Sequence, residues 1–229
     1  MPKLFHLSCS PRADSESSAG ARVFIDRFRE ARPDWDIDVM NLWRDHLPEF
    51  EGYVLEAKYA RIGGRAFTDS QRDAFAVTER IALRFALADR VLISTPMWNF
   101  GIPYKLKQWI DVITQPGLAF RFDPAQGYLP LFKDRPTAVI LASGSDFITG
   151  MNRGRIDMAT PYLREALRFI GITDVRFVPI GPTTGPAEPI RTARESTPNV
   201  ARPSRLRPRA RSSTRCSIPV SRLSPPPRR

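Results

Sequence analysis

The segment Arg90–Asp111 constrains the fold more than any other part of the chain, because it has the sequence of a buried strand, a loop and a helix. The apolar run Val91–Ile93 is typical of a strand that is buried on both faces. Thr95-Pro96 ends it, since the residue before a proline avoids the helical region and proline cannot donate to a ladder. We expect Gly101 to let the backbone turn and Pro103 to occupy the first helical position. Apolar residues at helical spacing follow, namely Leu106, Trp109 and Ile110.

The residues between the expected strand and helix form a loop at the carboxyl end of a parallel strand. Open α/β sheets bind their ligands at this edge. An apolar and aromatic loop with one amide side chain suits a flat heteroaromatic ring better than a phosphate or a metal. The residues alone equally allow a hydrophobic loop that only covers the end of the sheet. The loop consists of Met97, Trp98, Asn99 and Phe100.

This segment resembles a known flavin-binding sequence. The run Pro96–Pro103 (PMWNFGIP), followed by Leu106-Lys107 and Trp109-Ile110-Asp111, is similar to the flavin-contacting segment of the FMN-dependent NADH:quinone oxidoreductases and azoreductases. These enzymes belong to the flavodoxin-like NAD(P)H-quinone oxidoreductase superfamily. The resemblance extends over about residues 1–192 and implies that the Asn99 side chain and the loop backbone hold the N5 and O4 edge of the flavin ring.

The same resemblance implies non-covalently bound FMN and a two-step cycle. NADH or NADPH transfers a hydride to the flavin and leaves, and a quinone or azo compound then takes the electrons in the same place. No residue is an obvious acid or base, and none is required if protons come from water. The family is generally dimeric, so we expect a homodimer with its sites at the subunit interface. The alternative is a flavodoxin-like electron carrier that holds FMN without NADH turnover.

Strands and helices alternate along the chain, which predicts an α/β fold with a parallel sheet. We expect a flavodoxin-like three-layer fold with five strands in the order 2-1-3-4-5. Gly171 is expected to end the last helix before the fifth strand. The expected strands are residues 3–8, 36–42, 91–94, 135–142 and 173–178, and the expected helices include residues 17–32, 54–61, 68–88 and 160–170, with Thr68 or Asp69 as a cap.

A serine-rich loop precedes the first expected helix. Serine is a favoured helix cap, and composition alone favours capping. Hydroxyls, backbone N–H groups and the positive end of the helix dipole also suit an anion. Ser-Pro-Arg followed by spaced serines resembles the FMN phosphate loop of the family, which makes the candidates Ser10, Ser15, Glu16, Ser17 and Ser18.

Two other functions of this loop are disfavoured. A dinucleotide-binding loop needs glycines, and none occurs between Met1 and Ala19. A low-molecular-weight phosphatase has an arginine six residues after its cysteine, whereas the sixth residue after Cys9 is Ser15 and Arg12 comes too early. We therefore interpret Cys9 as a small packed residue.

Two later segments are assigned by resemblance. Residues 117–132 have the sequence of a small hairpin, and Phe120 takes the place of a family aromatic residue that covers the flavin and the substrate. The alternative is a hairpin that packs on its own domain. The loop after the fourth strand is implied to contact the pyrimidine edge of the ring, unless it is an ordinary turn. It contains Ser143, Gly144, Ser145 and Asp146, and the Asp146 carboxylate would be unfavourable near N1–C2=O unless it points away.

The net charge of +11 comes from the end of the chain. Residues 196–229 contain nine of the 35 Lys and Arg residues and no acidic residue, which leaves 26 basic against 24 acidic residues, or +2, in the remainder. This distribution argues against nucleic acid as a partner of the folded domain. We expect a domain over residues 1–192 and a disordered Arg/Pro/Ser-rich tail over 193–229, with the beginning of a last helix over residues 186–195, across this boundary. The tail is either a frameshifted C-terminus that has lost this helix or a genuine polybasic segment.

The sequence also bears on location. No apolar run approaches the ~20 residues that span a bilayer. The first residues lack the regions of a signal peptide. Two cysteines, Cys9 and Cys216, make no disulfide framework. We expect a cytoplasmic protein with no membrane partner and no metal.

Overall fold

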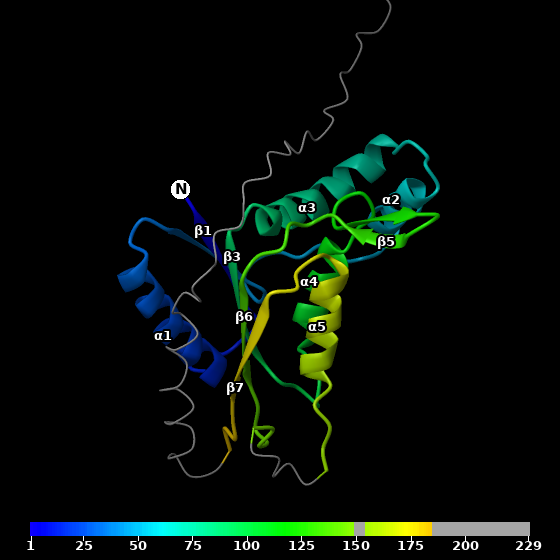
Figure 1. Cartoon of the computed structure of the whole chain (residues 1–229). Coiled ribbons are helices and arrows are strands. Elements are labelled where there is room, and N and C mark those ends of the chain that lie inside the picture. Colours follow the sequence, from blue (N-terminus) through cyan, green and yellow to red (C-terminus); the bar gives the residue numbers. More distant parts are fainter. Residues whose placement is uncertain (149–153, 185–229) are drawn as a thin grey trace, which may run out of the picture.

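A five-stranded parallel sheet forms the centre of the computed structural model, which describes residues 1–148 and 154–184 (Figure 1). The strand order is β2-β1-β3-β6-β7, which is the predicted order 2-1-3-4-5 because β4 and β5 form a separate hairpin. All neighbouring strands of the sheet run parallel. The flavodoxin-like α/β fold is therefore confirmed. The strands are β1 (Lys3–Ser8), β2 (Asp36–Asn41), β3 (Arg90–Pro96), β6 (Thr137–Ala142) and β7 (Val175–Ile180).

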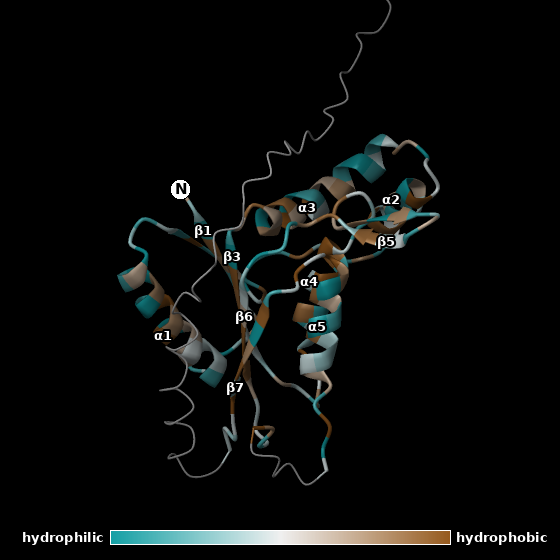
Figure 2. Cartoon of the chain, viewed as in Figure 1, coloured by the Kyte–Doolittle hydropathy of each residue, from teal (hydrophilic) through white to brown (hydrophobic). Residues whose placement is uncertain are grey.

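Helices cover both faces of the sheet (Figure 1). On one face lies α1 (Glu16–Ala31), and on the other lie α3 (Asp69–Ala86), α4 (Tyr104–Ile113) and α5 (Ala159–Phe169). A further helix, α2 (Gly52–Ile62), packs on α3. The middle of the sheet is mainly hydrophobic, whereas the helices show hydrophilic and hydrophobic colours side by side (Figure 2). This is the pattern of a three-layer fold, in which only one stripe of each helix is buried.

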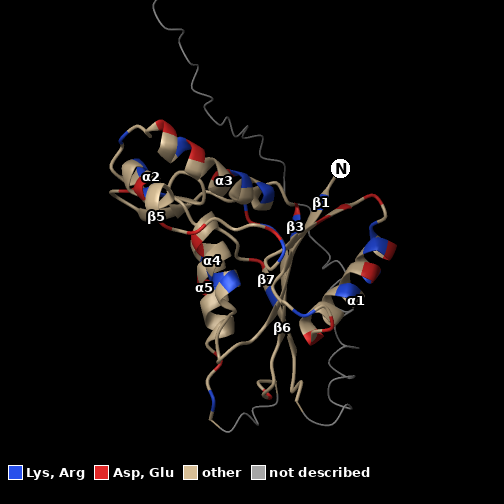
Figure 3. Ribbon diagram, turned by 180° about the vertical axis from the view of Figure 1, so that it is seen from behind, with Lys and Arg blue, Asp and Glu red and all other residues tan. Residues whose placement is uncertain are grey.

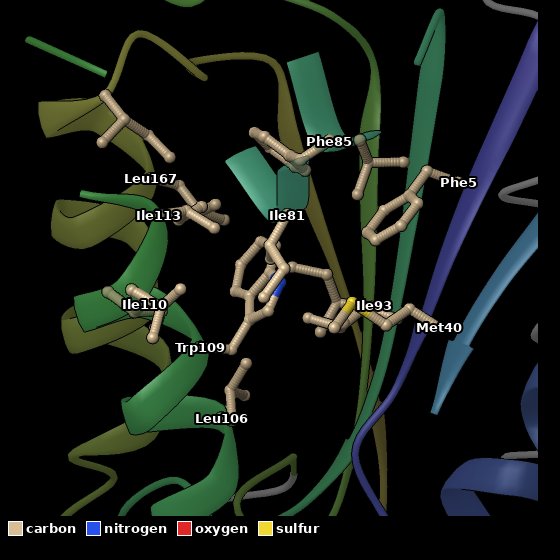
Figure 4. Close-up of a cluster of buried hydrophobic side chains, with 14 of the residues drawn as sticks. Phe5, Met40, Ile81, Phe85, Ile93, Leu106, Trp109, Ile110, Ile113 and Leu167 are labelled. Atoms are coloured by element: carbon tan, nitrogen blue, oxygen red, sulfur yellow. The ribbon is translucent and has the colours of Figure 1, made fainter. Parts of the chain in front are cut away.

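Successive side chains of β1 point to opposite layers, which creates two cores. Leu4 packs with α1, whereas Phe5 packs with α3 and α4. The larger core is centred on Trp109, whose ring stacks on Phe5 at a centroid distance of 6.4 Å and meets Phe85 edge-on at 5.3 Å (Figure 4). The expected helix face of Leu106, Trp109 and Ile110 is buried against the sheet. This packing fixes where α4, and the loop that precedes it, sit on β3.

The helix ends agree with the predicted capping residues, except at the start of α4. The Thr68 hydroxyl accepts from the Gln71 N–H and the Gln71 side chain accepts from the Thr68 N–H, so Thr68 forms the predicted cap. Gly171 follows α5 with a φ of +104°, and an added Cβ would lie 2.5 Å from the Phe132 carbonyl oxygen, so only glycine fits. Pro103 is the residue before the helix and not its first residue, because α4 begins at Tyr104.

The predicted excursion is a two-stranded antiparallel hairpin, β4 (Phe120–Asp123) and β5 (Gly127–Pro130). Basic and acidic side chains are interspersed on α1, α2 and α3 (Figure 3), as expected for a nearly neutral domain. Observed element bounds differ from the predicted ones by a few residues, as is usual at frayed ends. The predicted boundary at residue 192, the helix start over 186–195 and the tail over 193–229 lie outside the described residues.

Candidate functional site

Three loops meet where adjacent strands β1, β3 and β6 end. Backbone hydrogen bonds tie each loop to its neighbour: the Cys9 N–H donates to the Ser94 carbonyl at 2.9 Å, and the Met97 N–H donates to the Ala142 carbonyl at 2.7 Å. The Ser143 N–H donates to the Ile180 carbonyl at 2.8 Å on the far side. The loop between β1 and α1, which contains Ser10 and Ser15 and is called the serine loop below, therefore shares one edge of the sheet with the Met97–Phe100 loop and the Ser143–Asp146 loop, as the sequence predicted (lower part of Figure 1).

The Met97–Phe100 loop contains a tight two-residue turn. Trp98 and Gly101 exchange N–H···O bonds of 3.0 and 2.9 Å across it. The two central residues, Asn99 and Phe100, have φ of +47° and +70°, as a type I′ turn requires. Asparagine tolerates this left-handed region, but phenylalanine rarely adopts it, and such residues cost roughly 1–3 kcal/mol each. Strain of this kind is retained where the backbone has a specific task.

The prediction that Gly101 provides the turn is wrong. Its φ is not in the left-handed region, and a Cβ there would meet only the Trp98 carbonyl oxygen at 3.8 Å, an ordinary contact. Asn99 and Phe100 adopt the special conformation because the Trp98–Gly101 hydrogen bonds close the turn on either side. The Phe100 carbonyl also accepts from the Met158 N–H at 2.9 Å, which anchors the turn to the start of α5.

The serine loop both caps α1 and gathers hydroxyls at its positive end. Ser15 is the N-cap, and its Oγ accepts from the Ser18 N–H at 3.2 Å. The same Oγ lies 2.8 Å from Ser18 Oγ and 3.3 Å from that of Ser17, a residue only 1% exposed. Ser10 is also buried, and its Oγ accepts from the Arg12 N–H at 3.3 Å. Capping and anion binding are thus compatible here, because the cap uses one hydroxyl and leaves the cluster intact.

Glu16 is the first residue of α1. A carboxylate there is favourable toward the helix dipole but repels a phosphate. Any part of Glu16 in an anion site is therefore its backbone N–H.

The loop after β6 is held by its own hydroxyls. Ser143 Oγ donates to the Ser145 carbonyl at 2.6 Å, and Thr184 Oγ1 donates to the Gly144 carbonyl at 2.6 Å. The Asp146 carboxylate accepts from the Ile148 N–H at 2.9 Å, so it takes part in the loop's own backbone turn. Arg155 donates to Ser145 Oγ at 3.0 Å and brings a positive charge to this loop.

Phe120 lies away from these loops within one chain. Its ring packs on Phe169 at 5.1 Å and on Tyr128 at 5.6 Å. Phe169 ends α5, whereas Phe100 contacts the residue before that helix begins. An 11-residue helix is about 16 Å long, so Phe100 and Phe120 are near opposite ends of α5. In a single chain the hairpin packs on its own domain, which was the alternative.

Trp43 is a site residue that sequence reasoning missed. Its Nε1–H donates to the Cys9 carbonyl at 3.0 Å, which links the serine loop to the segment after β2. Its ring meets Trp98 at 5.7 Å and Tyr104 at 5.3 Å, and so supports the Met97–Phe100 loop from the side. An aromatic residue close behind the end of a predicted strand was the available signal, since that position is again at the carboxyl edge of the sheet.

Two buried titratable groups lie beneath the loops. Burial raises the pKa of the Cys9 thiol, whose Sγ donates to the Leu7 carbonyl at 3.6 Å, so Cys9 is a packed residue and not a thiolate nucleophile. Burial lowers the pKa of the His6 imidazole from 6.5 to about 4, and its Nε2 is 2.9 Å from Ser94 Oγ. His6 is therefore neutral near pH 7 and adds no positive charge to this edge.

No group of three or more His, Cys, Asp and Glu residues in the described ranges is placed to hold a metal ion. Among the helices of residues 1–148 and 154–184, none is both long enough and apolar enough to cross a membrane.

Comparison with known proteins agrees with this geometry. A family model described as a flavodoxin-like fold matches residues 2–197. FMN-dependent NADH:quinone oxidoreductase 1 of Bradyrhizobium diazoefficiens is 78% identical over 196 residues, which cover 86% of this chain and 94% of that protein. An FMN-dependent NADH:quinone oxidoreductase of Ruegeria pomeroyi is 40% identical over 184 residues, or 80% of this chain and 90% of that protein.

Solved structures of azoreductases have the same fold as this chain. An azoreductase from Bacillus anthracis str. Sterne superposes with a TM-score of 0.78 at 25% identity, over 88% of this chain and 99% of that chain. A second structure, of an FMN-dependent NADH-azoreductase from Bacillus anthracis str. Ames Ancestor in complex with FMN, superposes with a TM-score of 0.77 at 26% identity. The match covers 88% of this chain and 98% of that chain. The fold and the three loops thus define a flavodoxin-like protein. Within that class, the chain belongs to the family of FMN-dependent NADH:quinone oxidoreductases, and the resemblance seen in the sequence is confirmed.

Proposed function

We propose that this chain binds FMN non-covalently and transfers electrons from NADH or NADPH to quinones or aromatic azo compounds. The observation that carries the proposal is the strained Asn99–Phe100 turn, which lies between the serine loop and the Ser143–Asp146 loop at one sheet edge. A phosphate-sized anion and a flat ring are the two chemistries that these loops offer. FMN contains both, and the family to which the chain belongs is named for it.

The donor set fits the FMN phosphate. Ser10, Ser15, Ser17 and Ser18 supply hydroxyls, and the first turn of α1 supplies backbone N–H groups and the positive dipole end. Hydrogen bonds from these groups to a phosphate are charge-assisted, and Arg12 and Arg22 line the same cavity as Ser10 and Ser18. Removing a hydroxyl should therefore weaken FMN more than riboflavin, which lacks the phosphate.

The other two loops fit the ring. The Asn99 amide and the Met97–Phe100 backbone would hold its N5 and O4 edge, and Ser143–Asp146 its pyrimidine edge. The type I′ turn presents peptide groups in a fixed orientation, which suits ring atoms better than a mobile side chain would. The Asp146 carboxylate already accepts a backbone N–H in its loop, and Arg155 on Ser145 offsets the negative charge.

When bound, FMN supplies the chemistry of accepting a hydride and passing two electrons on. NADH loses two electrons and one proton as that hydride and becomes NAD⁺, and a quinone gains two electrons and two protons to become a hydroquinone. The second proton comes from water, since His6 is buried and neutral and Cys9 is a buried thiol. The residues of this chain bind and orient both substrates in turn.

We further propose that the active form is a homodimer. One chain leaves many large apolar side chains exposed on α2, α4, the hairpin and the segment before α5. A second copy would cover them and would bring its Phe120, which cannot reach the Asn99 loop of its own chain, toward the flavin. These exposed side chains are Tyr53, Tyr59, Ile62, Tyr104, Phe122, Tyr128, Ile156 and Met158.

Spectroscopy tests the proposed function. The purified full-length protein should show flavin absorbance bands between about 300 and 550 nm that bleach with NADH under anaerobic conditions and recover with a quinone. Bands that bleach with dithionite but not with NADH or NADPH would favour the electron-carrier alternative. A folded, colourless protein that does not take up added FMN would refute both.

The location and the chain end are also proposals. A cytoplasmic location suits a chain whose Cys9 is buried and reduced. The matched family region ends at residue 197, which supports a domain of about residues 1–192 and an appended tail over 193–229. Deletion of residues 196–229 separates the two hypotheses for the tail. If the deletion variant keeps its activity but loses nucleic-acid affinity, a functional polybasic segment is favoured. If neither the full-length protein nor the deletion variant binds nucleic acid, and the deletion leaves solubility unchanged or improves it, an altered C-terminus is favoured.

A further inference from the structure

The segment Gly154–Met158, which precedes α5, contacts both loops that would hold the flavin ring. Its last residue, Met158, donates its N–H to the Phe100 carbonyl at 2.9 Å. Asp157 Oδ1 accepts from the N–H groups of the first two residues of α5, at 2.9 Å each. Such a side-chain cap fixes the direction in which the chain enters the helix. The residues just before Asp157 are therefore held beside the carboxyl edge of the sheet.

Arg155 is the residue of this segment that reaches the Ser143–Asp146 loop. Its Nη1 donates to Ser145 Oγ at 3.0 Å. A hydroxyl that accepts one hydrogen bond can still donate its own hydrogen, and a charged partner polarises it and makes it a stronger donor. Arg155 thus brings a positive charge and a polarised hydroxyl to the loop that would hold the pyrimidine edge of the ring.

Asp146 brings the opposite charge to the same loop. Its carboxylate accepts from the Ile148 N–H at 2.9 Å. The two buried titratable groups beneath the loops add no charge near pH 7, because His6 is a neutral imidazole and Cys9 is a neutral thiol. The electrostatic potential at this loop therefore depends directly on the balance between the Arg155 guanidinium and the Asp146 carboxylate.

We propose that Arg155 and Asp146 tune the reduction potential of the bound flavin in opposite directions, with Arg155 stabilising the reduced form. The inference rests on the proposed function, because it concerns the group that the Ser143–Asp146 loop would hold. A hydride carries two electrons and one proton, so its transfer from NADH leaves one additional negative charge on the ring, which grows along the N1–C2=O edge. A nearby positive charge favours that product, and a nearby carboxylate opposes it.

Arg155 acts through its charge and through Ser145, so it is a positioning residue. Its side chain is exposed within one chain. This role does not require exposure, because a second copy that covered Arg155 would exclude water and strengthen the effect of its charge.

The affinities for oxidised and reduced FMN measure this effect. Both dissociation constants are determined for the full-length protein by anaerobic titration, with FMN and with dithionite-reduced FMN. In Arg155→Gln the ratio of the oxidised to the reduced dissociation constant should fall about fivefold, which is the scale of an exposed charge interaction. For a two-electron couple this fall lowers the midpoint potential by about 20 mV, which a dye-equilibrated reductive titration checks. Asp146→Asn should raise the ratio by a similar factor.

Two further variants separate charge from structure. Arg155→Lys keeps the charge and should keep the ratio within about twofold of that of the parent protein. Arg29→Gln removes an exposed arginine in the last turn of α1, at the other end of the helix from the serine loop, and should leave the ratio unchanged. The shifts in Arg155→Gln and Asp146→Asn should shrink at high salt. A damaged loop would instead weaken both forms of FMN alike, without opposite shifts.

The outcomes distinguish this inference from the proposed function. If the protein binds FMN and oxidises NADH, but both variants keep the parent ratio or shift it in the same direction, the inference is wrong and the proposed function stands. If the ratios shift in opposite directions but neither NADH nor NADPH is oxidised, the inference stands and the electron-carrier alternative is favoured. A folded protein that takes up no FMN would refute both.

Discussion

The buried Arg135 guanidinium should be a main determinant of stability, because it caps the carboxyl end of α3. Its Nη1 donates to the carbonyls of Phe85, Ala86 and Ala88 at 2.8, 3.0 and 2.9 Å, and its Nε donates to the Lys133 carbonyl at 2.9 Å. The side chain is only 5% exposed. A positive charge at this end also complements the helix dipole.

Replacement by methionine gives a calculable loss. Arg135→Met keeps the apolar stem but leaves the carbonyls without their charged donor, and a buried acceptor left unpaired costs about 1–3 kcal/mol. The Phe85 carbonyl keeps the Ala88 N–H as a second donor, so it loses less than the others. Removing the charge also relieves the desolvation that lowers the pKa of Arg135, which offsets part of the loss. The expected net destabilisation is about 3 kcal/mol, or a fall in Tm of roughly 6–12 °C for a domain of this size.

Differential scanning calorimetry of the FMN-saturated protein measures this change. Arg80→Met is the matched control, because Arg80 lies exposed on the same helix, and it should stay within about 0.5 kcal/mol of the parent protein. Arg135→Lys should fall between the two, since an ammonium cannot reproduce the planar donor geometry. A Tm shift of less than about 2 °C in Arg135→Met would refute the reasoning, because it would mean that water replaces the guanidinium at no cost.

Three further predictions concern the site. Phe100→Gly should relieve the positive-φ strain and raise Tm by about 2–4 °C while FMN affinity falls, whereas Gly101→Ala should change Tm very little. Thermal melts and FMN titration measure both effects. A lower Tm for Phe100→Gly would contradict the strain argument. Ser15→Ala should cost about 1 kcal/mol of stability through the lost cap and weaken FMN but not riboflavin; an equal loss for both ligands would argue against phosphate binding by this loop. The pKa of His6 is about 4 in the folded chain and 6.5 in the unfolded chain. As the pH falls, the unfolded chain therefore binds a proton first, and the free energy of unfolding decreases by about 3 kcal/mol between pH 6.5 and 4. Urea unfolding of the parent and of His6→Asn at pH 7, 5.5 and 4 isolates this contribution, and parallel pH profiles would rule it out.

Much of the architecture follows from local sequence. Runs such as Val91–Ile93 and the fully buried β6 read as strands because both of their faces are covered, and Leu106, Trp109 and Ile110 read as a helix face because of their spacing. Since parallel strands end at one edge, these patterns also predicted that the serine loop, the Asn99 loop and the Ser143 loop would meet. The sequence patterns by themselves therefore determined the layers and the edge that carries the site, whereas the strand order was expected from the flavodoxin-like resemblance.

Tertiary structure decided the rest, because it depends on contacts between residues far apart in the chain. Glycine is the usual signal for a left-handed turn, yet here the hydrogen bonds around Trp98 and Gly101 impose that conformation on Asn99 and Phe100. Trp43 joined the site because packing placed the segment after β2 beside Trp98 and Cys9. Within one chain, Phe120 lies away from the Asn99 loop because the length of α5 separates the hairpin from that loop. Periodicity records which face of an element is buried, but it carries no information on the distance between two elements once they have packed.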